Sequence, residues 1–269
     1  MSALAGIRLL SLALNLPGPV AVARLVALGA SAVKVEPPAG DPFAAYCRGW
    51  YDTLHAGVTV VALDLKSAEG RAECDRRLGD TEVLITSQRP AALARLGLGA
   101  ASLGERFPAL RTVAIVGDTA APERAGHDVT YQAEAGLIRE RLPATLLADL
   151  VGAERVVTSV LLALRSAPGT VLQVGLRDAV EALRSPLDHG LTVDGGPFGG
   201  ADPAYNVYRS RDGQVAVAAL ETHFRTRLYA ALDLPLDAPL HAVMAARSGA
   251  EWMAFASAHD LPISAVRAD

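Results

Sequence analysis

The sequence predicts an α/β protein with two domains: a large one built on a Rossmann-like parallel sheet, and a smaller α+β one. Short aliphatic runs alternate with helix-like segments through residues 7–183, a pattern typical of a parallel sheet. The glycine-rich stretch Gly195–Gly200 (GGPFGG) then marks a junction, after which the pattern changes. A chain of 269 residues is long enough for a large core and a smaller companion. We therefore expect a large domain over 1–190 and a small domain over 191–269.

The elements of the large domain follow one another as strand and helix. A strand at 7–13, a helix opened by Pro17 and a strand at 32–36 form the first β-α-β unit. The connection between them reads LNLPGP and lacks the GxGxxG pattern, so it does not favour a dinucleotide site. Further strands are expected at 59–65, 83–85, 111–116 and 170–174, with helices after the cap residue Ser67, at 150–165 and at 177–183.

The small domain is expected to mix strands and helices in a shorter stretch of chain. The pattern predicts strands at 205–209 and 214–219 and helices near 222–232 and 250–259. Two short strands and two helices fit an α+β arrangement better than a continuation of the parallel sheet.

Composition and charge narrow the class of function. The net charge is −4 and both signs are dispersed, which favours neither nucleic acid nor an anionic membrane as a partner. Cys47 and Cys74 are the only cysteines and form no CxxC pattern, so we expect no zinc site, no disulfide framework and a reducing, cytoplasmic location. The apolar start is interrupted by Arg8 and supplies the first strand and helix, so we do not interpret it as a secretion signal, and no apolar run is long enough to span a membrane.

Three side chains are candidates for chemistry. Asp149 stands alone among apolar neighbours at the start of a long helix, where it can cap the helix and also be held ionised as a base or nucleophile. His127 precedes Asp128, and spacing alone favours a loop histidine beside a residue that caps a helix reaching Gly136. His127 and Asp149 could nevertheless border one cleft at the end of the parallel sheet. Glu221 ends a strand, where a helix-start carboxylate is an equally good interpretation.

Several short motifs carry a resemblance to a known family. They are Gly18-Pro19, Leu28-Gly29-Ala30 through Lys34-Val35-Glu36, ALDLKS at 62–67 with Glu69-Gly70-Arg71, Arg89-Pro90, LGLG at 96–99, AGHDVTY at 125–131 and LAD at 147–149. With these motifs, the chain resembles the family III CoA-transferases, a group that includes α-methylacyl-CoA racemase, from about residue 6 to residue 267. The resemblance implies the family III CoA-transferase fold.

Two chemistries in that family share one aspartate, and Asp149 matches it. In the transferases this aspartate carries the acyl group covalently and then a thioester, whereas in the racemases it faces a histidine as an acid/base pair. The AGHD motif with Tyr131, the segment at 205–209 and the ALE motif ending at Glu221 resemble the racemase branch. The resemblance therefore implies His127, Asp149 and Glu221 as catalytic residues, with Tyr131 supporting them and Asp128 orienting the imidazole or only capping a helix.

The reaction implied is the inversion of the α-carbon of a 2-methyl or other α-substituted acyl thioester. One group removes the α-proton from one face, and the other delivers a proton to the opposite face through an enolate. Backbone N–H groups at the start of the Asp149 helix are candidate donors to the enolate oxygen. No metal or separate cofactor is expected, since the thioester carrier is part of the substrate.

The carrier site departs from the family pattern. The resemblance places Lys34, Glu36 and Arg89 near CoA, although a solvated lysine is the alternative interpretation of Lys34. Where the family has several cations before the third strand, this chain reads HAGVTV at 55–60, and Pro37 replaces a further basic residue. A pantetheine thioester on a carrier protein would explain this loss, and so would a non-catalytic paralogue.

Three hypotheses for the function stay open. The first is a cofactor-independent racemase or epimerase, the second a CoA-transferase with Asp149 as nucleophile, and the third a binding or scaffold subunit. The resemblance also implies a homodimer. The family's last segment, which returns to the large domain, is not in this sequence, so interlocking of the two subunits is not implied.

Overall fold

The structure, a computed structural model, describes residues 2–267 of a chain that divides into two compact units, Met1–Arg184 and Ser185–Asp269. The division falls six residues before the boundary that the sequence predicts, so the glycine-rich stretch at 195–200 lies inside the second unit. Each unit has a hydrophobic core of its own. No helix within residues 2–267 combines the length and the apolar character that crossing a bilayer requires.

The larger unit contains a parallel sheet with the Rossmann strand order. Over the described residues this sheet has six strands in the order β3-β2-β1-β4-β5-β6, and each pairs in parallel with its neighbours. The order reverses between β1 and β4, and sheets of this kind bind ligands at the carboxyl ends of the strands beside such a reversal. The predicted parallel sheet is confirmed. The strands are β1 (Arg8–Ser11), β2 (Ser31–Glu36), β3 (Thr59–Ala62), β4 (Val83–Thr86), β5 (Arg111–Val116) and β6 (Val171–Gly175).

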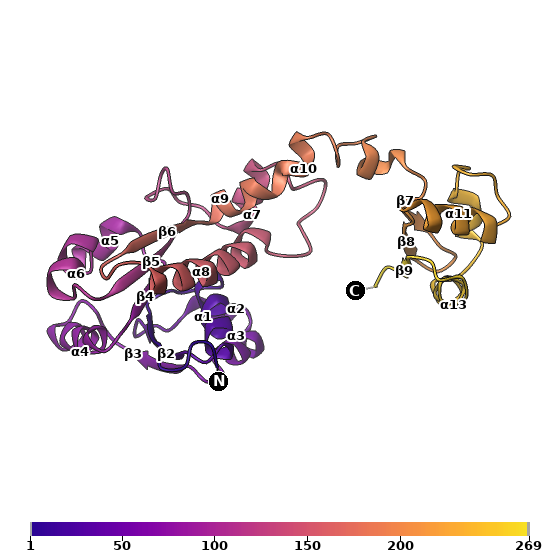
Figure 1. The fold of residues 1–269 in the computed structure, drawn as a ribbon. Helices are drawn as coiled ribbons and strands as arrows, with labels where there is room; N and C mark the ends of the chain where they lie inside the picture. The colour runs from indigo at the N-terminus through magenta and orange to yellow at the C-terminus, as the bar shows by residue number, and fades with distance from the viewer. Residues whose placement is uncertain (1, 268–269) are drawn as a thin grey trace. The chain divides into compact units, whose positions relative to one another are not determined.

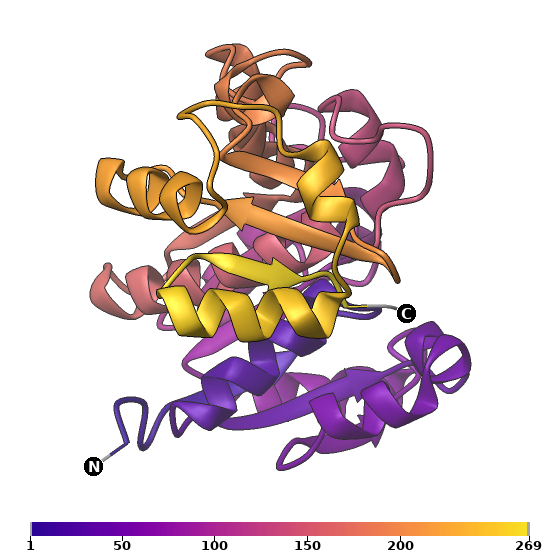
Figure 2. The same cartoon turned by 90° about the vertical axis from the view of Figure 1, so that its right-hand side faces the viewer.

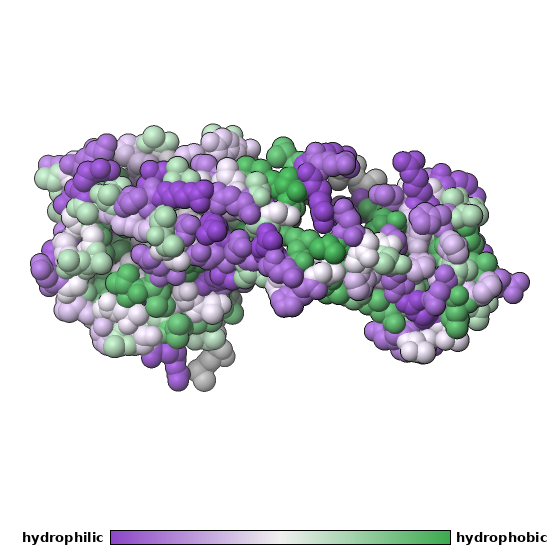
Figure 3. Space-filling model, turned by 90° about the horizontal axis from the view of Figure 1, so that it is seen from above, coloured by the Kyte–Doolittle hydropathy of each residue, from purple (hydrophilic) through white to green (hydrophobic). Residues whose placement is uncertain are grey.

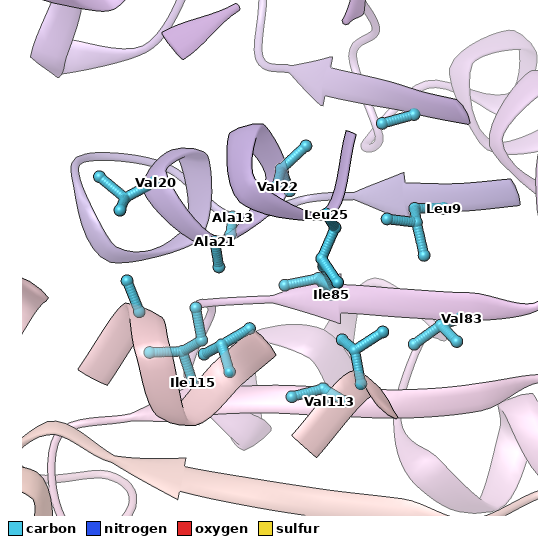
Figure 4. Close-up of a cluster of buried hydrophobic side chains, with 14 of the residues drawn as sticks. Leu9, Ala13, Val20, Ala21, Val22, Leu25, Val83, Ile85, Val113 and Ile115 are labelled. Atoms are coloured by element: carbon cyan, nitrogen blue, oxygen red, sulfur yellow. The ribbon is translucent and has the colours of Figure 1, made fainter. Parts of the chain in front are cut away.

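Helices cover both faces of this sheet (Figure 1). On one face, α1, α3 and α8 bury a core in which Leu25 of α1 lies over Ile85 and Val113 of the strands (Figure 4). On the other face, α4, α5 and α6 bury a second cluster that contains Leu84. The helical segments are α1 (Pro17–Ala27), α2 (Pro42–Tyr46), α3 (Arg48–Leu54), α4 (Ala68–Gly79), α5 (Pro90–Arg95), α6 (Ala100–Arg106), α7 (Asp128–Glu134), α8 (Leu147–Arg165), α9 (Leu176–Glu181) and η1 (Ala182–Arg184).

Local sequence signals explain where several helices begin. Ser67 caps α4, since its side chain accepts a hydrogen bond of 3.0 Å from the Gly70 N–H, as the sequence predicts. Pro17 opens α1 and Pro90 opens α5, where a missing N–H costs no helical hydrogen bond. Helix α8 begins at Leu147, three residues earlier than predicted, and this shift places Asp149 inside the first turn.

The smaller unit is α+β, as predicted. Its antiparallel sheet has the order β7-β8-β9, and Figure 2 shows α13 lying along the sheet beside β9. Trp252, Tyr208 and Leu228 fill its core and are each at most 2% exposed. The elements are α10 (Ser185–Asp188), η2 (Pro197–Ala201), β7 (Tyr205–Arg209), β8 (Gln214–Ala218), α11 (Thr222–Ala231), α12 (His241–Ala245), α13 (Gly249–His259) and β9 (Ile263–Ala265).

The surface in Figure 3 mixes hydrophilic and apolar residues. Purple hydrophilic residues are spread over the face shown, and green apolar residues occur among them in small groups. Single exposed apolar side chains are normal on proteins in water, so this face by itself points to no apolar partner.

Candidate active site

A cavity of about 160 Å³ opens in the larger unit at the carboxyl ends of β1, β4 and β5, beside the reversal of strand order. Asn15 follows β1, Ser87 follows β4 and Gly117 follows β5, and all three line the cavity. His127 and Asp149 both line this cavity. Its lining residues are Leu14, Asn15, Pro17, Ser87, Arg89, Ile115, Val116, Gly117, Pro122, Arg124, Gly126, His127, Tyr131, Asp149 and Leu176.

Asp149 lies in the first turn of α8, partly buried, with its carboxylate accepting no hydrogen bond from residues 2–267. Burial, and secondly the negative charge of Asp128, raise the pKa of the Asp149 carboxyl to about 7. The sequence places Asp149 at the helix cap and expects it to be held ionised there. That expectation is wrong, because the N–H groups of Ala148 and Asp149 at the start of α8 are occupied by another carboxylate.

That other carboxylate belongs to Asp128, which is 5% exposed. Its Oδ1 accepts hydrogen bonds from the Ala148 N–H at 2.7 Å and the Asp149 N–H at 3.2 Å, so it caps α8 from a separate helix. Asp128 is the first residue of α7, and its side chain does not cap that helix. Asp128 therefore has neither of the two roles expected for it, which were capping the helix that reaches Gly136 and orienting the imidazole. It caps α8. The same bonds occupy two of the N–H groups expected to serve the enolate oxygen.

His127 occupies the cap position of α7 in an extended conformation (φ −141°, ψ 167°). Its backbone N–H donates to Thr130 Oγ1 at 3.0 Å, and the Thr130 hydroxyl donates back to the His127 carbonyl at 2.7 Å. These bonds fix the backbone, and the imidazole is exposed at the cavity. A ring in this situation can meet a substrate and exchange a proton with it.

The side chain of Tyr131 lies on the buried side of α7 and is 3% exposed. A Cβ atom at Gly126 would lie 2.4 Å from the Tyr131 Cε1 atom, and one at Gly117 would lie 2.3 Å from its hydroxyl. Only glycine at these two positions leaves room for the ring. Burial raises the pKa of the Tyr131 hydroxyl, which therefore stays protonated at the cavity and can donate a hydrogen bond.

Arg89 borders the same cavity from the cap position of α5. Its side chain is exposed, and within residues 2–267 it has no hydrogen-bond or ion-pair partner. A guanidinium in this situation has its donors available for a phosphate or carboxylate.

Lys34 is 1% exposed, so the interpretation of a solvated lysine is wrong. Its ammonium lies 2.5 Å from Asp41 Oδ2, 3.0 Å from Glu36 Oε1 and 2.9 Å from His55 Nε2. Because three partners surround the ammonium inside the protein, it presents no donor to a CoA phosphate in this structure. Lys34 therefore belongs to the buried structure of the fold and does not make the expected contact with the carrier.

Glu36 shares this buried cluster and is 6% exposed. Its carboxylate accepts a hydrogen bond of 2.7 Å from the Tyr51 hydroxyl and one of 3.1 Å from the Asp41 N–H. The His55 Nδ1 atom lies 2.6 Å from the Tyr51 carbonyl, so the ring donates there and its Nε2 accepts from Lys34. Burial lowers the pKa of His55. His55 thus completes a buried structural network with Lys34 and Tyr51.

Glu221 occupies the cap position of α11 in the second unit. Glu221 therefore lies at a helix start, as one interpretation of the sequence has it. Its side chain, however, is exposed and makes no capping hydrogen bond. Its assignment to catalysis stays a prediction.

Two residues of the site are absent from the sequence-based set. Arg124 lines the cavity and pairs with Glu134, with its Nη2 atom 2.5 Å from Oε1. Gln132 is fully buried, and its Nε2 donates to Asp128 Oδ2 at 2.5 Å. The spacing of Asp128 and Gln132, four residues apart on one helix, was the signal available for this contact. Among residues 2–267, no group of three or more His, Cys, Asp or Glu side chains is arranged to hold a metal ion.

Comparison with known proteins gives this geometry a context. The family described as CoA-transferase family III matches residues 4–269. A probable fatty acyl-CoA transferase of Mycobacterium tuberculosis is 28% identical over 208 residues, which cover 67% of this chain and 52% of that protein. Alpha-methylacyl-CoA racemase of Mus musculus is 28% identical over 263 residues, which cover 86% of this chain and 65% of the racemase. This chain thus spans 52% to 65% of the length of these two relatives.

The fold recurs in a solved structure. The crystal structure of the protein Rv3272 from Mycobacterium tuberculosis has a TM-score of 0.85 to this chain at 23% identity, covering 99% of this chain and 86% of that one. At this identity the similarity supports the fold.

Proposed function

This chain belongs to CoA-transferase family III, and from that premise we propose that it is a racemase or epimerase of acyl thioesters. The substrate class is a thioester with a 2-methyl or other α-substituted acyl group. His127 and Asp149 act as the two proton-transfer groups.

The observation that carries this proposal is the shared cavity of His127 and Asp149, with the pKa of Asp149 near 7. Racemisation in both directions requires each group to serve as base for one enantiomer and as acid for the other. A carboxyl with a pKa near 7 is populated in both forms at neutral pH, and imidazole is the side-chain group that most often acts as general acid and base in enzymes. The two groups are therefore suited to both roles.

The proton balance of the reaction is simple. One group takes the α-proton, and the electron pair of the C–H bond moves into the thioester carbonyl to form an enolate. The other group then protonates the α-carbon from the opposite face, which restores the thioester with inverted configuration. The Tyr131 hydroxyl at the cavity is a candidate donor to the enolate oxygen. Proton transfer by these side chains needs no redox cofactor or metal.

The carrier of the acyl group is CoA or pantetheine, as part of the substrate. Arg89 is the cation of the expected carrier set that remains exposed at the cavity, whereas Lys34 is buried in its own network. One exposed guanidinium supports weaker recognition of the CoA nucleotide than several cations would. Pantetheine on a carrier protein is thus a substrate to test beside CoA. By analogy with the family, we also propose a homodimer.

A second candidate is a CoA-transferase with Asp149 as nucleophile. The carboxylate accepts no hydrogen bond from the described residues and lines the cavity, so its oxygens are open for attack on a thioester carbonyl. Attack would release the carrier thiolate and form a mixed anhydride. The transferase and racemase relatives are each 28% identical to this chain, so identity does not separate the two chemistries.

Two parallel assays distinguish these candidates. A single enantiomer of a 2-methylacyl thioester is incubated with the protein, and the enantiomer ratio is followed by chiral chromatography. In the second assay, hydroxylamine is added during transfer between two acids, since it traps an activated aspartyl intermediate. Loss of enantiomeric purity without trapping supports the racemase, and trapping with acid exchange supports the transferase. Inactivity in both assays, with CoA and with pantetheine thioesters, leaves the non-catalytic paralogue.

A further inference from the structure

One buried carboxylate connects the two segments that carry the proposed proton-transfer groups. Asp128 directly follows His127 in the chain, and its Oδ1 holds the N–H groups of Ala148 and Asp149. The backbone N–H of Asp149 is therefore hydrogen-bonded to Asp128, and Asp128 is the residue next to His127. A change in the position of Asp128 would move both groups relative to one another.

Gln132 holds this carboxylate from its second oxygen. The Gln132 Nε2 donates to Asp128 Oδ2 at 2.5 Å and to the Thr145 carbonyl at 3.2 Å. Gln132 thus links the first residue of α7 to the chain that enters α8. The Gln132 Oε1 atom is buried without a hydrogen-bond partner, and such an atom costs stability. An apolar side chain of similar shape at position 132 would avoid that cost, but it could not donate a hydrogen bond to Asp128.

The network also acts through charge. With its first-turn N–H groups bonded to Asp128, α8 offers little compensation to a charge on Asp149, and the Asp128 carboxylate repels that charge. The other titratable side chains that line the cavity with Asp149 are His127, Tyr131, Arg89 and Arg124. Arg124 is paired with Glu134, so its charge is partly neutralised.

We propose that Asp128, held by Gln132, is a positioning residue that ties the His127 segment to the first turn of α8 and places a fixed negative charge beside Asp149. The proposal rests on the proposed roles of His127 and Asp149, but its geometry and its charge effect can be measured without any substrate.

The first test measures the titration of Asp149 directly. Carboxyl carbons of ¹³C-labelled aspartate are followed by NMR against pH, and the Asp149 signal is assigned by its loss in Asp149→Asn. In Asp128→Asn we expect the pKa of Asp149 to fall by about one pH unit, because the like charge is removed. The matched control is Glu154→Gln, which removes a charge from the exposed side of the same helix, where Glu154 pairs with Arg24. An unchanged pKa in folded Asp128→Asn would overturn the proposal.

The second test uses the unmodified protein and so avoids a variant that fails to fold. Amide hydrogen exchange is measured at Ala148 and Asp149, whose N–H groups at a helix start lack an intrahelical partner. If both are bonded to Asp128, they exchange at least about 100-fold more slowly than in an unstructured chain. Rapid exchange at both positions contradicts the geometry.

The third test separates positioning from general stability. The pH profile of α-proton exchange in Asp128→Asn should move toward lower pH together with the pKa of Asp149, whereas a purely structural defect lowers the amplitude at an unchanged midpoint. Gln132→Met should lower kcat at least fivefold and leave KM within about twofold, because the substrate contacts remain. If the wild-type protein shows no exchange, the proposed function fails, and the NMR and amide measurements still decide the role of Asp128.

Discussion

Tyr131 packs its ring directly against Gly126, so closely that a Cβ atom at Gly126 would lie 2.4 Å from the Tyr131 Cε1 atom. Gly126→Ala must therefore displace the ring or the backbone that leads into His127. We expect this variant to lose at least about tenfold in kcat, since small misplacements of catalytic groups are costly. The measurement is the initial rate of racemisation.

Gly104→Ala is the matched control for that substitution. Gly104 lies in α6, and a Cβ atom there would meet nothing within 4 Å. Alanine in a helix interior favours the fold by about 0.5 to 1 kcal/mol relative to glycine. This variant should keep wild-type activity, and equal activities in the two variants would show that the Gly126 contact does not matter.

Asp149→Asn should stabilise the protein above neutral pH. The pKa of Asp149 is about 7 when folded and near 3.9 when unfolded, so between these values the folded state binds a proton that the unfolded state releases. The wild-type residue thus loses stability as pH rises from about 4 to 7. The gain in unfolding free energy of the variant should grow over that window, level off above it and not exceed about 4 kcal/mol. Urea unfolding at pH 5 and pH 8 measures it, and a gain independent of pH would contradict the assigned pKa.

Lys34→Met should destabilise the larger unit strongly. The substitution leaves the Asp41 and Glu36 carboxylates buried without their cation. Breaking a buried ion pair on one side costs about 3 to 5 kcal/mol. Lys66→Met, on an exposed side chain, should change stability by no more than about 0.5 kcal/mol. Similar unfolding midpoints for the two variants would be incompatible with the buried network.

Arg89→Ala tests the carrier site. A charge-assisted hydrogen bond contributes about 1.5 to 3 kcal/mol, so KM for a CoA thioester should rise about tenfold or more. For the corresponding pantetheine thioester, which has no nucleotide, KM should change little. Steady-state kinetics on both substrates checks this, and a KM unaffected for both would remove Arg89 from the carrier site.

Much of the sheet could be predicted, because its strands are short, continuous aliphatic runs between turn signals. The range Arg111–Val116 was predicted to the residue. The short helices α2, α3, α5 and α6 were not predicted, since helices of five to seven residues carry too few turns for a periodic pattern. The carboxyl ends of parallel strands meet at one edge, so a common cavity for His127 and Asp149 could be expected from the sequence.

The partners inside the site could not be predicted in the same way. Asp128 caps a helix that begins 19 residues later in the chain, and capping rules consider only neighbouring residues. Lys34 was expected to contact the carrier or else to be solvated, whereas it is buried, which is rare for lysine. Both errors come from tertiary packing, which places partners that no local pattern specifies.

The most direct test of the central claim is deuterium wash-in at the α-carbon in heavy water, with each enantiomer of a 2-methylacyl thioester supplied separately. With a proton-transfer group on each face, the wild-type protein should exchange both enantiomers. Asp149→Asn and His127→Gln should each retain exchange with one enantiomer, and the retained enantiomers should be opposite. Exchange of both enantiomers at wild-type rates in both variants, or no exchange by the wild-type protein, would contradict the account.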